Sequence, residues 1–370
     1  MIKKIKSLLY NLFLLFPYSF GQRKKYYKGD EKNSILKFID LSLWLLRDNQ
    51  FNHHYYAFGL NIKKSNQNVY IGRKEFLLLK QKAENMLKSA GGFDDIEYAV
   101  LTKDKFVANA FFLANCIPCV PVLGLITSDE ILYTDGRIEP LDELIRFDEP
   151  FVLKNVILEY GEGFMLCTSE GGKISTDGVA LSLHELRERV GNGKWVIQKR
   201  IKSHEAIRKL NATALNTTRI VTILNGKYPV YITGFQSFAT GNAEIDSWGH
   251  GSLYVGYNDR ESVLKGLGYY HPEVEKYARV EAHPDAGVKF DGYFIPYLNE
   301  AVELCLKAHR LLYNNFIIGW DIVITDEGPL ILEANERPGM NAVQCIDGGL
   351  RFKIREYYNN TVNYIKERTY

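Results

Sequence analysis

Near the C-terminal end of the sequence, two carboxylates and one side-chain amide have the spacing of a metal site. The apolar strands GWDIVIT and PLILEAN flank an Asp-Glu-Gly turn, and a tight hairpin centred near Glu327 places Asp321 opposite Glu333. Side chains alternate along a strand, so Asn335 lies on the same face as Glu333. Opposed carboxylates in apolar strands repel unless a cation lies between them, and oxygen ligands suit magnesium. The sequence therefore predicts Mg²⁺ bound by Asp321, Glu333 and Asn335, with solvated strand residues as the alternative.

The turn that follows has the composition of a phosphate-binding loop. Residues 336–341 read ERPGMN, in which Pro338 fixes the turn and Gly339 lets the backbone approach a ligand closely. Backbone N–H groups in such a turn can bind phosphate oxygens. Joined to the predicted metal site, this turn indicates nucleotide chemistry, and Arg337 within it is a candidate catalytic residue.

Length and composition favour a folded enzyme with several lobes. The 370 residues are enough for two or three separate cores, and 46% hydrophobic with 24% charged residues is typical of a folded soluble chain. The 46 basic and 44 acidic residues leave a formal net charge of +2, so there is no overall basic field of the kind that binds nucleic acid. We therefore expect small-molecule partners and no nucleic acid.

The cysteines favour a reducing compartment. They are scattered and odd in number, and only Cys116 and Cys119 form a CxxC motif. That motif lies in an apolar run, with no second CxxC or histidine pair at zinc spacing. Buried core thiols are favoured over a metal or redox role, and a cytoplasmic location follows.

The segments that must position the predicted site differ in their patterns. The early part of the chain has helical spacing, and the stretch 103–148 has the character of a small α/β unit. Later segments read as antiparallel strands, two of them joined at Asn225-Gly226, which is a strong hairpin signal. The predicted segments are an amphipathic helix at 1–22, a helical lobe at 23–101, an ATP-binding subdomain at 102–201 and a subdomain with the metal and acceptor sites at 202–370.

The N-terminal segment leaves two interpretations open. Its apolar run is far shorter than the roughly 20 residues that span a bilayer, and no small-residue cleavage site follows it. It could be an interfacial helix that makes peripheral contact with a membrane, or a helix packed on the protein body. In the first case basic residues would face anionic lipid and apolar ones would enter the headgroup boundary: Lys3, Lys4 and Lys6, and Leu9, Leu12, Phe13 and Phe16.

Several motifs in order resemble the ATP-grasp superfamily, and in detail the sugar-transfer-associated ATP-grasp proteins found among surface-polysaccharide genes. The resemblance covers roughly residue 103 to the C-terminus and runs through KDKF, FVLK with a Gly-rich loop, WVIQKRI, LNTTRIVTIL and the GWDIVIT/ILEANERPGM hairpin. The ExNxxPGM run is also similar to that of D-alanine:D-alanine ligases. The resemblance implies an α+β fold, in which two subdomains hold ATP between antiparallel sheets, with a helical N-terminal lobe added.

The resemblance also implies residue roles. Lys154 has an independent physical argument, since a lysine that ends an apolar strand is costly to bury without an anionic partner. Arg219 lies mid-strand, where it would face the transferred phosphoryl group or form an internal salt bridge. The implied set is Lys105 and Lys154 on the phosphates, Gly161 and Gly163 in the Gly-rich loop, Gln198 with the backbone of Lys199 and Ile201 at adenine, Glu205 on ribose, and Arg219.

Some positions depart from the family pattern. Asn155 stands where proline is usual, and the loop around Gly161 contains no lysine or arginine. In the acceptor-side loop, Asp246-Ser247 and Gly249-His250-Gly251 replace Asp-Asn and Gly-Gly. His204 and His250 are either acid–base groups or hydrogen-bonded structural residues.

Together these features predict a ligase that uses ATP and Mg²⁺. A carboxylate would be phosphorylated, and an amine would attack the acyl phosphate to give an amide. The resemblance implies small-molecule carboxylate and amine substrates, one of them a sugar acid or its nucleotide- or lipid-linked form, in capsule or other surface polysaccharide biosynthesis. A small-molecule kinase and a catalytically decayed scaffold are the alternatives.

Overall fold

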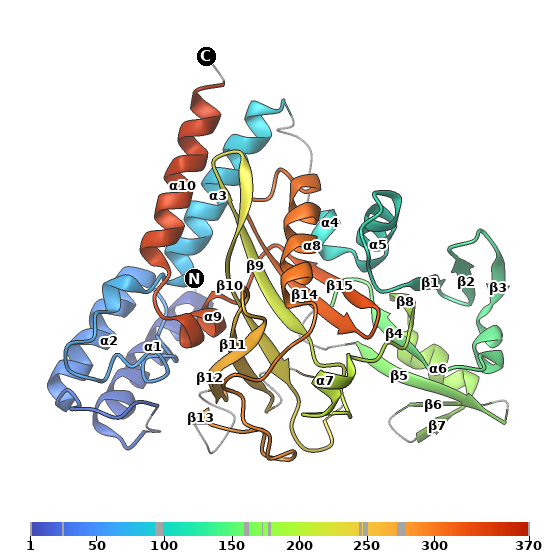
Figure 1. The fold of residues 1–370 in the computed structure, drawn as a ribbon, viewed down its shortest axis with the longest axis horizontal. Helices are drawn as coiled ribbons and strands as arrows, with labels where there is room; N and C mark the ends of the chain where they lie inside the picture. Colours follow the sequence, from blue (N-terminus) through green and yellow to red (C-terminus); the bar gives the residue numbers. More distant parts are fainter. Residues whose placement is uncertain are drawn as a thin grey trace.

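A helical lobe and two antiparallel sheets make up the protein, described here by a computed structural model (Figure 1). The described residues are 2–23, 26–92, 99–158, 163–171, 173–176, 179–243, 246, 251–271 and 279–368. The helical lobe and the first sheet lie at opposite ends of the molecule, with the second sheet between them. The second sheet therefore shares a hydrophobic core with the lobe on one side and meets the first sheet on the other.

The first sheet has the strand order β3-β2-β1-β8-β4-β5-β6-β7, with every pairing antiparallel. Segment 103–148 contributes three of these strands, and β1 pairs with β8, so they extend this sheet instead of forming one of their own. The strands are β1 Val122–Thr127, β2 Glu130–Tyr133, β3 Ile138–Pro140, β4 Phe151–Asn155, β5 Phe164–Glu170, β6 Lys173–Thr176, β7 Val179–Leu181 and β8 Lys194–Lys199.

The second sheet has the order β13-β12-β11-β10-β9-β14-β15. The predicted Asn225-Gly226 hairpin is confirmed, since β9 and β10 pair on either side of it and Gly226 has a φ of 67°, which favours glycine. The strands are β9 Thr218–Asn225, β10 Tyr228–Phe238, β11 Leu253–Asn258, β12 Val263–Tyr269, β13 Arg279–Val280, β14 Ile317–Thr325 and β15 Gly328–Asn335.

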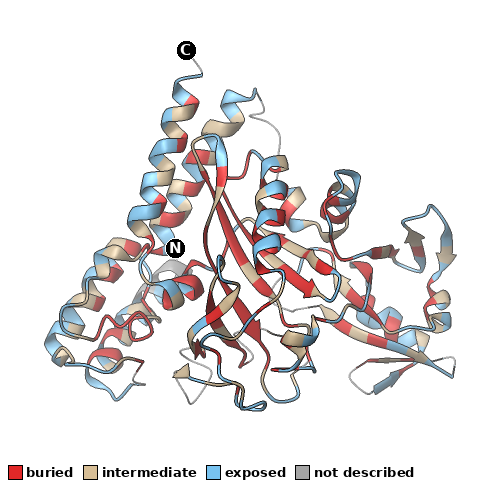
Figure 2. Cartoon of the chain, in the orientation of Figure 1, coloured by how far each residue is buried: buried red, intermediate tan, exposed pale blue. Residues whose placement is uncertain are grey.

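Helices cover both faces of the second sheet. Ile220 of β9 packs in the core beneath α8, whereas its neighbour Val221 packs in the core of the helical lobe, so β9 is buried on both sides (Figure 2). The helices are α1 Ile2–Phe20, α2 Ser34–Asp48, α3 Arg73–Ala90, α4 Val100–Lys103, α5 Lys105–Ala114, α6 Leu183–Val190, α7 Glu205–Arg208, α8 Leu298–Leu311, α9 Met340–Asp347 and α10 Arg351–Lys366, with 3-10 turns at Gln67–Val69 and Leu141–Arg146.

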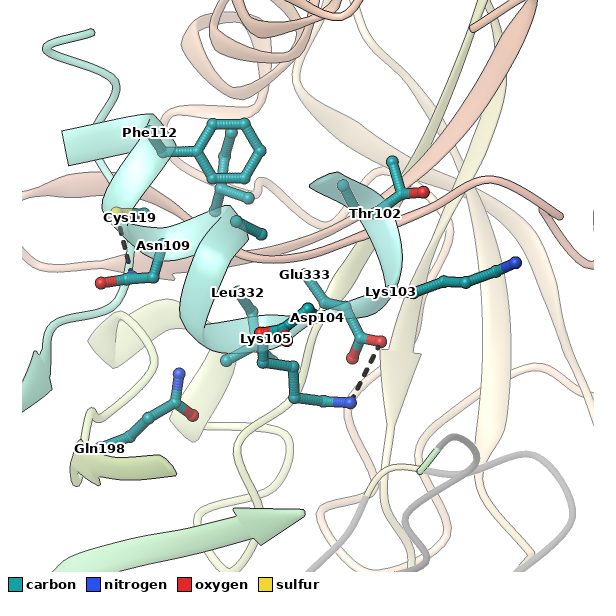
Figure 3. Close-up of a pocket in the computed structure, with 13 residues that line it drawn as sticks. Thr102, Lys103, Asp104, Lys105, Asn109, Phe112, Cys119, Gln198, Leu332 and Glu333 are labelled. Carbon is teal, nitrogen blue, oxygen red and sulfur yellow. Dashed lines mark hydrogen bonds and ion pairs between the residues drawn. The ribbon is translucent and has the colours of Figure 1, made fainter. Parts of the chain in front are cut away.

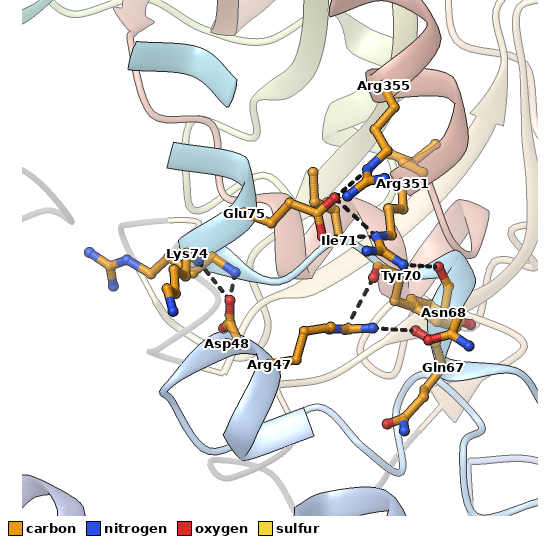
Figure 4. A network of polar contacts seen from close by, with 12 residues as sticks. Arg47, Asp48, Gln67, Asn68, Tyr70, Ile71, Lys74, Glu75, Arg351 and Arg355 are labelled. Atoms are coloured by element: carbon orange, nitrogen blue, oxygen red, sulfur yellow. Dashed lines mark hydrogen bonds and ion pairs between the residues drawn. The ribbon is translucent and has the colours of Figure 1, made fainter. Parts of the chain in front are cut away.

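The C-terminal helix α10 returns to the helical lobe and pairs with α3 through charges. Arg351 Nε lies 2.8 Å and 3.0 Å from the two carboxylate oxygens of Glu75, and Arg355 Nε lies 2.5 Å from one of them (Figure 4). We refer to Glu75, Arg351 and Arg355 as the lobe clamp. At the start of α3, the carboxylate of Asp48 accepts hydrogen bonds from the backbone N–H groups of Arg73 and Lys74. The lobe is therefore fixed to the far end of the chain.

The predicted hairpin of β14 and β15 is confirmed, with one local difference. Thr325 pairs with Gly328, so the turn itself contains two residues. Continuing that register would place Asp321 opposite Leu332. A shift between Asp321 and the next residue leaves Leu332 as an extra residue, and Asp321 faces Glu333 as predicted. A β-bulge, rather than the turn alone, sets this pairing.

Helix α1 packs on the lobe along one side, as one interpretation predicts, and the membrane contact of the other interpretation stays a prediction. It buries Leu15, Tyr18 and Ser19 against the lobe, whereas Leu9, Leu12, Phe13 and Phe16 are exposed. Among the described residues, no helix is both long and apolar enough to cross a bilayer. The domain boundaries at 22, 101 and 201 stay predictions.

The prediction of two buried thiols in the CxxC motif is correct for one residue only. Cys119 is buried, and its Sγ accepts a hydrogen bond from the Asn109 amide at 3.3 Å. Cys116 is exposed, because the chain turns there with a φ of 53° immediately after α5. Both thiols are free.

Candidate functional site

Three charged side chains form a row across adjacent strands of the second sheet. Arg219 of β9 pairs in register with Asp321 of β14, which pairs in turn with Glu333 of β15. Arg219 Nη2 donates to Asp321 Oδ2 at 3.2 Å, and Arg219 Nε lies 2.8 Å from Oδ1. These three residues are referred to below as the charged strip. The internal salt bridge and a phosphate-facing position, posed as alternatives for Arg219, are compatible here, because the strip also borders a cavity.

Arg219 retains hydrogen-bonding capacity despite its salt bridge. Burial disfavours the guanidinium charge, but Asp321 and the other acidic groups around it together raise the pKa of Arg219. The Nε–H, although close to Asp321, is buried without an aligned acceptor. The backbone must also approach closely here, since a Cβ on Gly319 would lie 2.9 Å from Arg219 Nη1 and 2.8 Å from Pro338 Cβ. A small residue at 319 therefore keeps Arg219 in place.

The three predicted metal ligands come together beside Arg219. Asn335 Nδ2 donates to Asp321 Oδ2 at 3.1 Å, and Asp321 is opposite Glu333. Burial raises the pKa of Glu333 and Asp321 raises it further, while Lys105, 3.7 Å from Oε1, lowers it only in part. A carboxylate that its lysine neighbour neutralises only in part, next to a second carboxylate, fits a divalent cation. Within the described ranges no three His, Cys, Asp or Glu side chains form a metal-binding group, so Mg²⁺ here would also need the Asn335 oxygen and ligand oxygens.

Lys105 approaches the strip from the first residue of α5. The Asp104 carboxylate caps this helix by accepting from the backbone N–H groups of Phe106 and Val107, and this fixes the direction in which α5 begins. Lys105 Nζ donates to the Leu158 carbonyl at 2.8 Å and points toward Glu333 (Figure 3). The lysine is therefore held between β15 and the segment after β4.

Lys154 is the other lysine predicted to contact phosphate. It lies on β4, with Nζ 5.9 Å from the centre of the Phe164 ring. In the described part of the chain no carboxylate lies within ion-pair distance of its Nζ. Burial lowers the pKa of Lys154, and Glu333 only partly restores it. An anionic ligand in the adjoining cavity would remove this deficit.

Of the residues predicted to bind adenine and ribose, only Gln198 lies near Lys105 and Glu333. Gln198 is buried on β8 and lies in the same close view as Lys105 and Glu333 (Figure 3). Lys199 is exposed, and its backbone N–H already donates to the Pro121 carbonyl at 3.2 Å. Ile201 follows the strand, and Glu205 begins α7, exposed and paired with a lysine one turn later. As far as the structure describes, Lys199, Ile201 and Glu205 do not line the main cavity, and their roles stay predictions.

The Gly-rich loop is described at one of its two predicted glycines. Gly161 lies outside the described residues. Gly163 borders the cavity with a φ of 66°, and a Cβ there would lie 2.8 Å from Asn155 Cβ. Position 163 therefore requires glycine for both conformation and space.

A cavity of about 860 Å³ connects the charged strip to the helical lobe. Lys105 and Lys154 line it near the strip, and Phe76 of α3 lines it on the lobe side. Phe235 and Tyr254 also border it, with their rings stacked at 4.0 Å. The volume is within the range of about 300–1,000 Å³ that ligand sites occupy. The cavity is therefore large enough for a small-molecule ligand.

The contribution of the lobe to this cavity was not anticipated. The lobe sequence carries no signal of chemistry, because its aromatic and basic residues follow helical packing periods and no motif spacing. Only the folded chain brings them to the site. The lobe residues that line the cavity are His54, Ile71, Arg73, Phe76 and Leu77.

The turn after β15 is tied to the lobe by a half-buried glutamate. The carboxylate of Glu336 lies 3.5 Å from Lys80 of α3 and 3.1 Å from Lys103. Burial opposes its charge, but these lysines keep the pKa of Glu336 below its usual value. Arg337, the candidate catalytic residue, is exposed at the cavity edge, with Nε 3.5 Å from Glu336. Glu336 is therefore a positioning group that the motif did not single out.

Asp246 is a half-buried carboxylate in the cavity wall. Its Oδ2 accepts hydrogen bonds from the backbone N–H and hydroxyl of Thr217 at 2.6 Å and 2.7 Å, and burial raises its pKa. Ser247, Gly249 and His250 lie outside the described residues. His204 has a structural role, since its Nδ1 accepts from a backbone N–H at the start of α7.

Comparison with known proteins places these features in context. A sequence model of the sugar-transfer-associated ATP-grasp family matches residues 92–356, a range that contains both sheets and the charged strip and leaves α1, α2 and α3 outside. A search of curated proteins gave no match.

Solved structures of ligases also resemble the chain. The D-alanine–D-alanine ligase of Bacillus anthracis is 15% identical, with a TM-score of 0.39 over 73% of this chain and 68% of that chain. The enzyme of the same name from Coxiella burnetii is 10% identical, with a TM-score of 0.43 over 78% and 68%. Phosphoribosylamine–glycine ligase of Thermotoga maritima is 16% identical, with a TM-score of 0.40 over 71% and 55%.

Proposed function

The chain belongs to the sugar-transfer-associated ATP-grasp family and has the α+β ATP-grasp fold, and from this premise we propose that it is an ATP-dependent carboxylate–amine ligase. The observation that carries the proposal is the charged strip, with Lys105 and Lys154 beside it, on one cavity wall. Such a wall provides cations for the anions that an acyl-phosphate reaction brings together.

The proposed reaction has two steps. A substrate carboxylate oxygen bonds to the γ-phosphorus of ATP as the bond to the bridging oxygen of ADP breaks. An amine nitrogen then bonds to the acyl carbon, the C–O bond to phosphate breaks, and the nitrogen loses a proton. Arg219 and Lys154 are suited to offset the repulsion between the substrate carboxylate and the γ-phosphate, because both are cations that line the cavity and the Nε–H of Arg219 has no aligned acceptor.

Asp321, Glu333 and Asn335 would hold Mg²⁺, which when bound would neutralise phosphate charge. Without it, the carboxylates of Asp321 and Glu333 would oppose a nucleotide in the cavity. Arg219 and Lys105 reduce this repulsion from two sides, since each contacts one of the carboxylates. These contacts fix both carboxylates before any substrate binds.

We assign the two substrates to surface polysaccharide biosynthesis in the cytoplasm, where ATP is available. The family name supports a sugar-related role. The stacked rings of Phe235 and Tyr254 suit the apolar face of a sugar ring, and Arg73 at the lobe side suits its carboxylate. One substrate would then be a sugar acid, free or carried on a nucleotide or lipid, and the other an amino compound.

A hydroxylamine trap tests this proposal. The purified chain is incubated with ATP, Mg²⁺, candidate sugar acids and hydroxylamine in place of the amine. We expect a hydroxamate together with equal amounts of ADP and inorganic phosphate. A stable phosphorylated product without released phosphate contradicts the ligase, and ATP binding without turnover on any acid supports the decayed scaffold.

Phosphorylation of a hydroxyl is the second candidate function, and Asp246 is the observation that favours it. A hydroxyl acceptor needs a general base, whereas a carboxylate is already a nucleophile. Asp246 borders the cavity, and its raised pKa brings it closer to the range of a base. If Asp246→Asn keeps hydroxamate formation within a few-fold, the ligase is favoured. If Asp246→Asn abolishes transfer to a hydroxyl acceptor, the kinase is favoured.

A further inference from the structure

Helices α1 and α2 lie at the end of the molecule remote from the first sheet (Figure 1), and both carry exposed large apolar side chains. The rings of Phe16 and Phe20 stack at 4.7 Å, and Phe20 lies 6.4 Å from the Phe38 ring of α2, which joins the two helices. We refer to the following residues as the apolar platform: Leu9, Leu12, Phe13, Phe16, Phe20, Ile35, Leu36, Phe38, Ile39, Leu43 and Leu46.

The outward face of α2 is the apolar one. Leu46 is 80% exposed and Ile35 is 65% exposed. They share this face with most of the other exposed apolar residues of α2, because 35, 39, 43 and 46 are three or four residues apart. A surface helix in water has the opposite arrangement, with polar residues outward. The sequence of α2 therefore fits an environment other than water on that side.

The charged residues of α2 point toward the protein instead. Arg47 donates to the carbonyls of Gln67 and Tyr70, and Asp48 caps the start of α3 (Figure 4). Lys37 pairs with a glutamate before the helix at 2.6 Å. The orientation of α2 is fixed by these contacts, so the helix cannot turn its apolar face inward without breaking them.

Helix α1 extends the same surface. Phe13 is 71% exposed and Phe16 is 67% exposed, one turn apart on the side of α1 opposite the buried Leu15. A monomer rarely exposes a contiguous apolar area of more than a few hundred Å² unless something covers it. The platform therefore marks a docking surface.

The charged residues of the N-terminal segment indicate what covers the apolar platform. Residues 1–29 contain lysines and an arginine but no aspartate or glutamate. Lys6 and Arg23, at either end of α1, are exposed. A second copy of the chain would place like charges against each other, because a two-fold interface meets itself. An anionic lipid surface attracts the same charges and accepts the apolar side chains below them.

We propose that the apolar platform docks on the surface of an anionic lipid bilayer, with α1 and α2 lying in the headgroup region and not crossing it. The lobe then holds the two sheets at a fixed orientation to the bilayer, since the lobe clamp and the Asp48 cap tie α2 and α3 to the body. This inference does not depend on which reaction the cavity performs.

Vesicle sedimentation of the full chain tests the proposal. Phosphatidylcholine vesicles are compared with vesicles of phosphatidylcholine and phosphatidylglycerol at low and high salt. Two platform variants change exposed residues only, Phe13→Ser/Phe16→Ser in α1 and Ile35→Ser/Leu46→Ser in α2. Phe294→Ser is the matched control, since Phe294 is also exposed but lies outside the platform.

We expect the wild type to sediment with anionic vesicles and to be released in part by salt. Each platform variant should lose at least tenfold in partitioning while keeping the melting temperature, and Phe294→Ser should bind like the wild type. Equal binding of the α2 variant and the wild type would overturn the inclusion of α2. No binding of the wild type to anionic vesicles overturns the proposal, as does light scattering that shows a dimer dissociated by the platform variants.

Discussion

The charged strip and the lobe clamp each contain a half-buried glutamate and at least one arginine, but the pKa values of the two glutamates shift in opposite directions. In the clamp, burial opposes the charge of Glu75, yet the two arginines that bond to it hold its pKa below the usual value. In the strip, burial raises the pKa of Glu333, and Lys105 fails to compensate because Asp321 adds to the rise. The arginines around Glu75 therefore more than offset the cost of burying its charge, whereas the cations around Glu333 do not.

This difference separates a structural network from a binding site. The clamp is complete within the protein, with each charged group bonded to another part of the chain. The strip leaves Arg219 with an unaligned N–H, and Lys154, which lines the same cavity, has no carboxylate within ion-pair distance among the described residues. A polar group without a hydrogen-bond partner and a charge without a counter-charge are expected at a site where a bound ligand and a cation supply them. The comparison can be tested by changing one side at a time.

The largest effect is expected for Glu333→Gln. Losing this carboxylate should lower ATP turnover by roughly 10³-fold, because a group that stabilises transition-state charge is worth about that much. The free energy of unfolding should stay equal or rise, since the change removes a carboxylate whose ionisation burial opposes. Steady-state ADP release and urea unfolding measure the two quantities.

The control for that variant lies in the same hairpin. Glu327 is exposed in the turn, so Glu327→Gln should change neither turnover nor stability. A Glu333→Gln protein that keeps wild-type turnover at limiting magnesium would show that the strip is structural, as the clamp is.

A smaller loss is expected for Gly319→Ala. The new Cβ would meet Arg219 Nη1 and Pro338 Cβ at less than 3 Å, so the guanidinium or the turn must move. A displacement of about 1 Å can cost roughly 10²-fold in rate. Arg219→Lys, which loses the two-point contact with Asp321, should give a loss of similar size. Normal kcat in both variants would exclude Arg219 from the reaction.

For the lobe clamp we expect a loss of stability with little change in turnover. Glu75→Gln should lower the free energy of unfolding by about 1–3 kcal/mol, because it removes charge-assisted hydrogen bonds to two arginines. Turnover per folded molecule should stay within a few-fold. A large loss of turnover with unchanged stability would contradict the assignment of a purely structural role to the lobe clamp.

The smallest expected effect is on the pH dependence of folding stability, and its sign differs between the lobe clamp and the charged strip. Glu75 has a lowered pKa, so its contribution is present above its unfolded value of 4.5 and is lost as pH falls through the folded value. Glu333 has a raised pKa, so its ionisation destabilises the fold as pH rises above 4.5. The melting temperature of Glu75→Gln should therefore approach that of the wild type in acid, whereas Glu333→Gln should gain relative to the wild type toward neutral pH. Parallel pH profiles for all three proteins would contradict the comparison.

The fold and the pairing of strands that carry the site could be predicted from sequence, because the sequence patterns that indicate them are local. The α+β ATP-grasp fold is confirmed, and so is the pairing of Asp321 with Glu333, although a bulge at Leu332 was needed to reach it. Turn residues and strand alternation act over a few positions, and both can be read directly. The roles of the site residues stay predictions.

The rest could not be predicted, because it depends on contacts between distant segments. Nothing near Glu75 indicates that α10 supplies its partners, and nothing near Phe76 indicates that it borders the cavity. The outward apolar face of α2 is also invisible in its sequence, since a helical period identifies an apolar side without saying which way it points. That direction is set by Arg47 and Asp48 bonding to other segments.

The lobe clamp also has a consequence for biosynthesis. Glu75 and Arg351 are separated by 276 residues, and at roughly 5–20 residues per second a ribosome needs on the order of 14–55 s to make the intervening chain. Throughout that interval α3 lacks the helix that covers it. The nascent lobe would carry both an uncovered α3 and the apolar helices α1 and α2, and would therefore be a natural client for a chaperone until α10 has emerged.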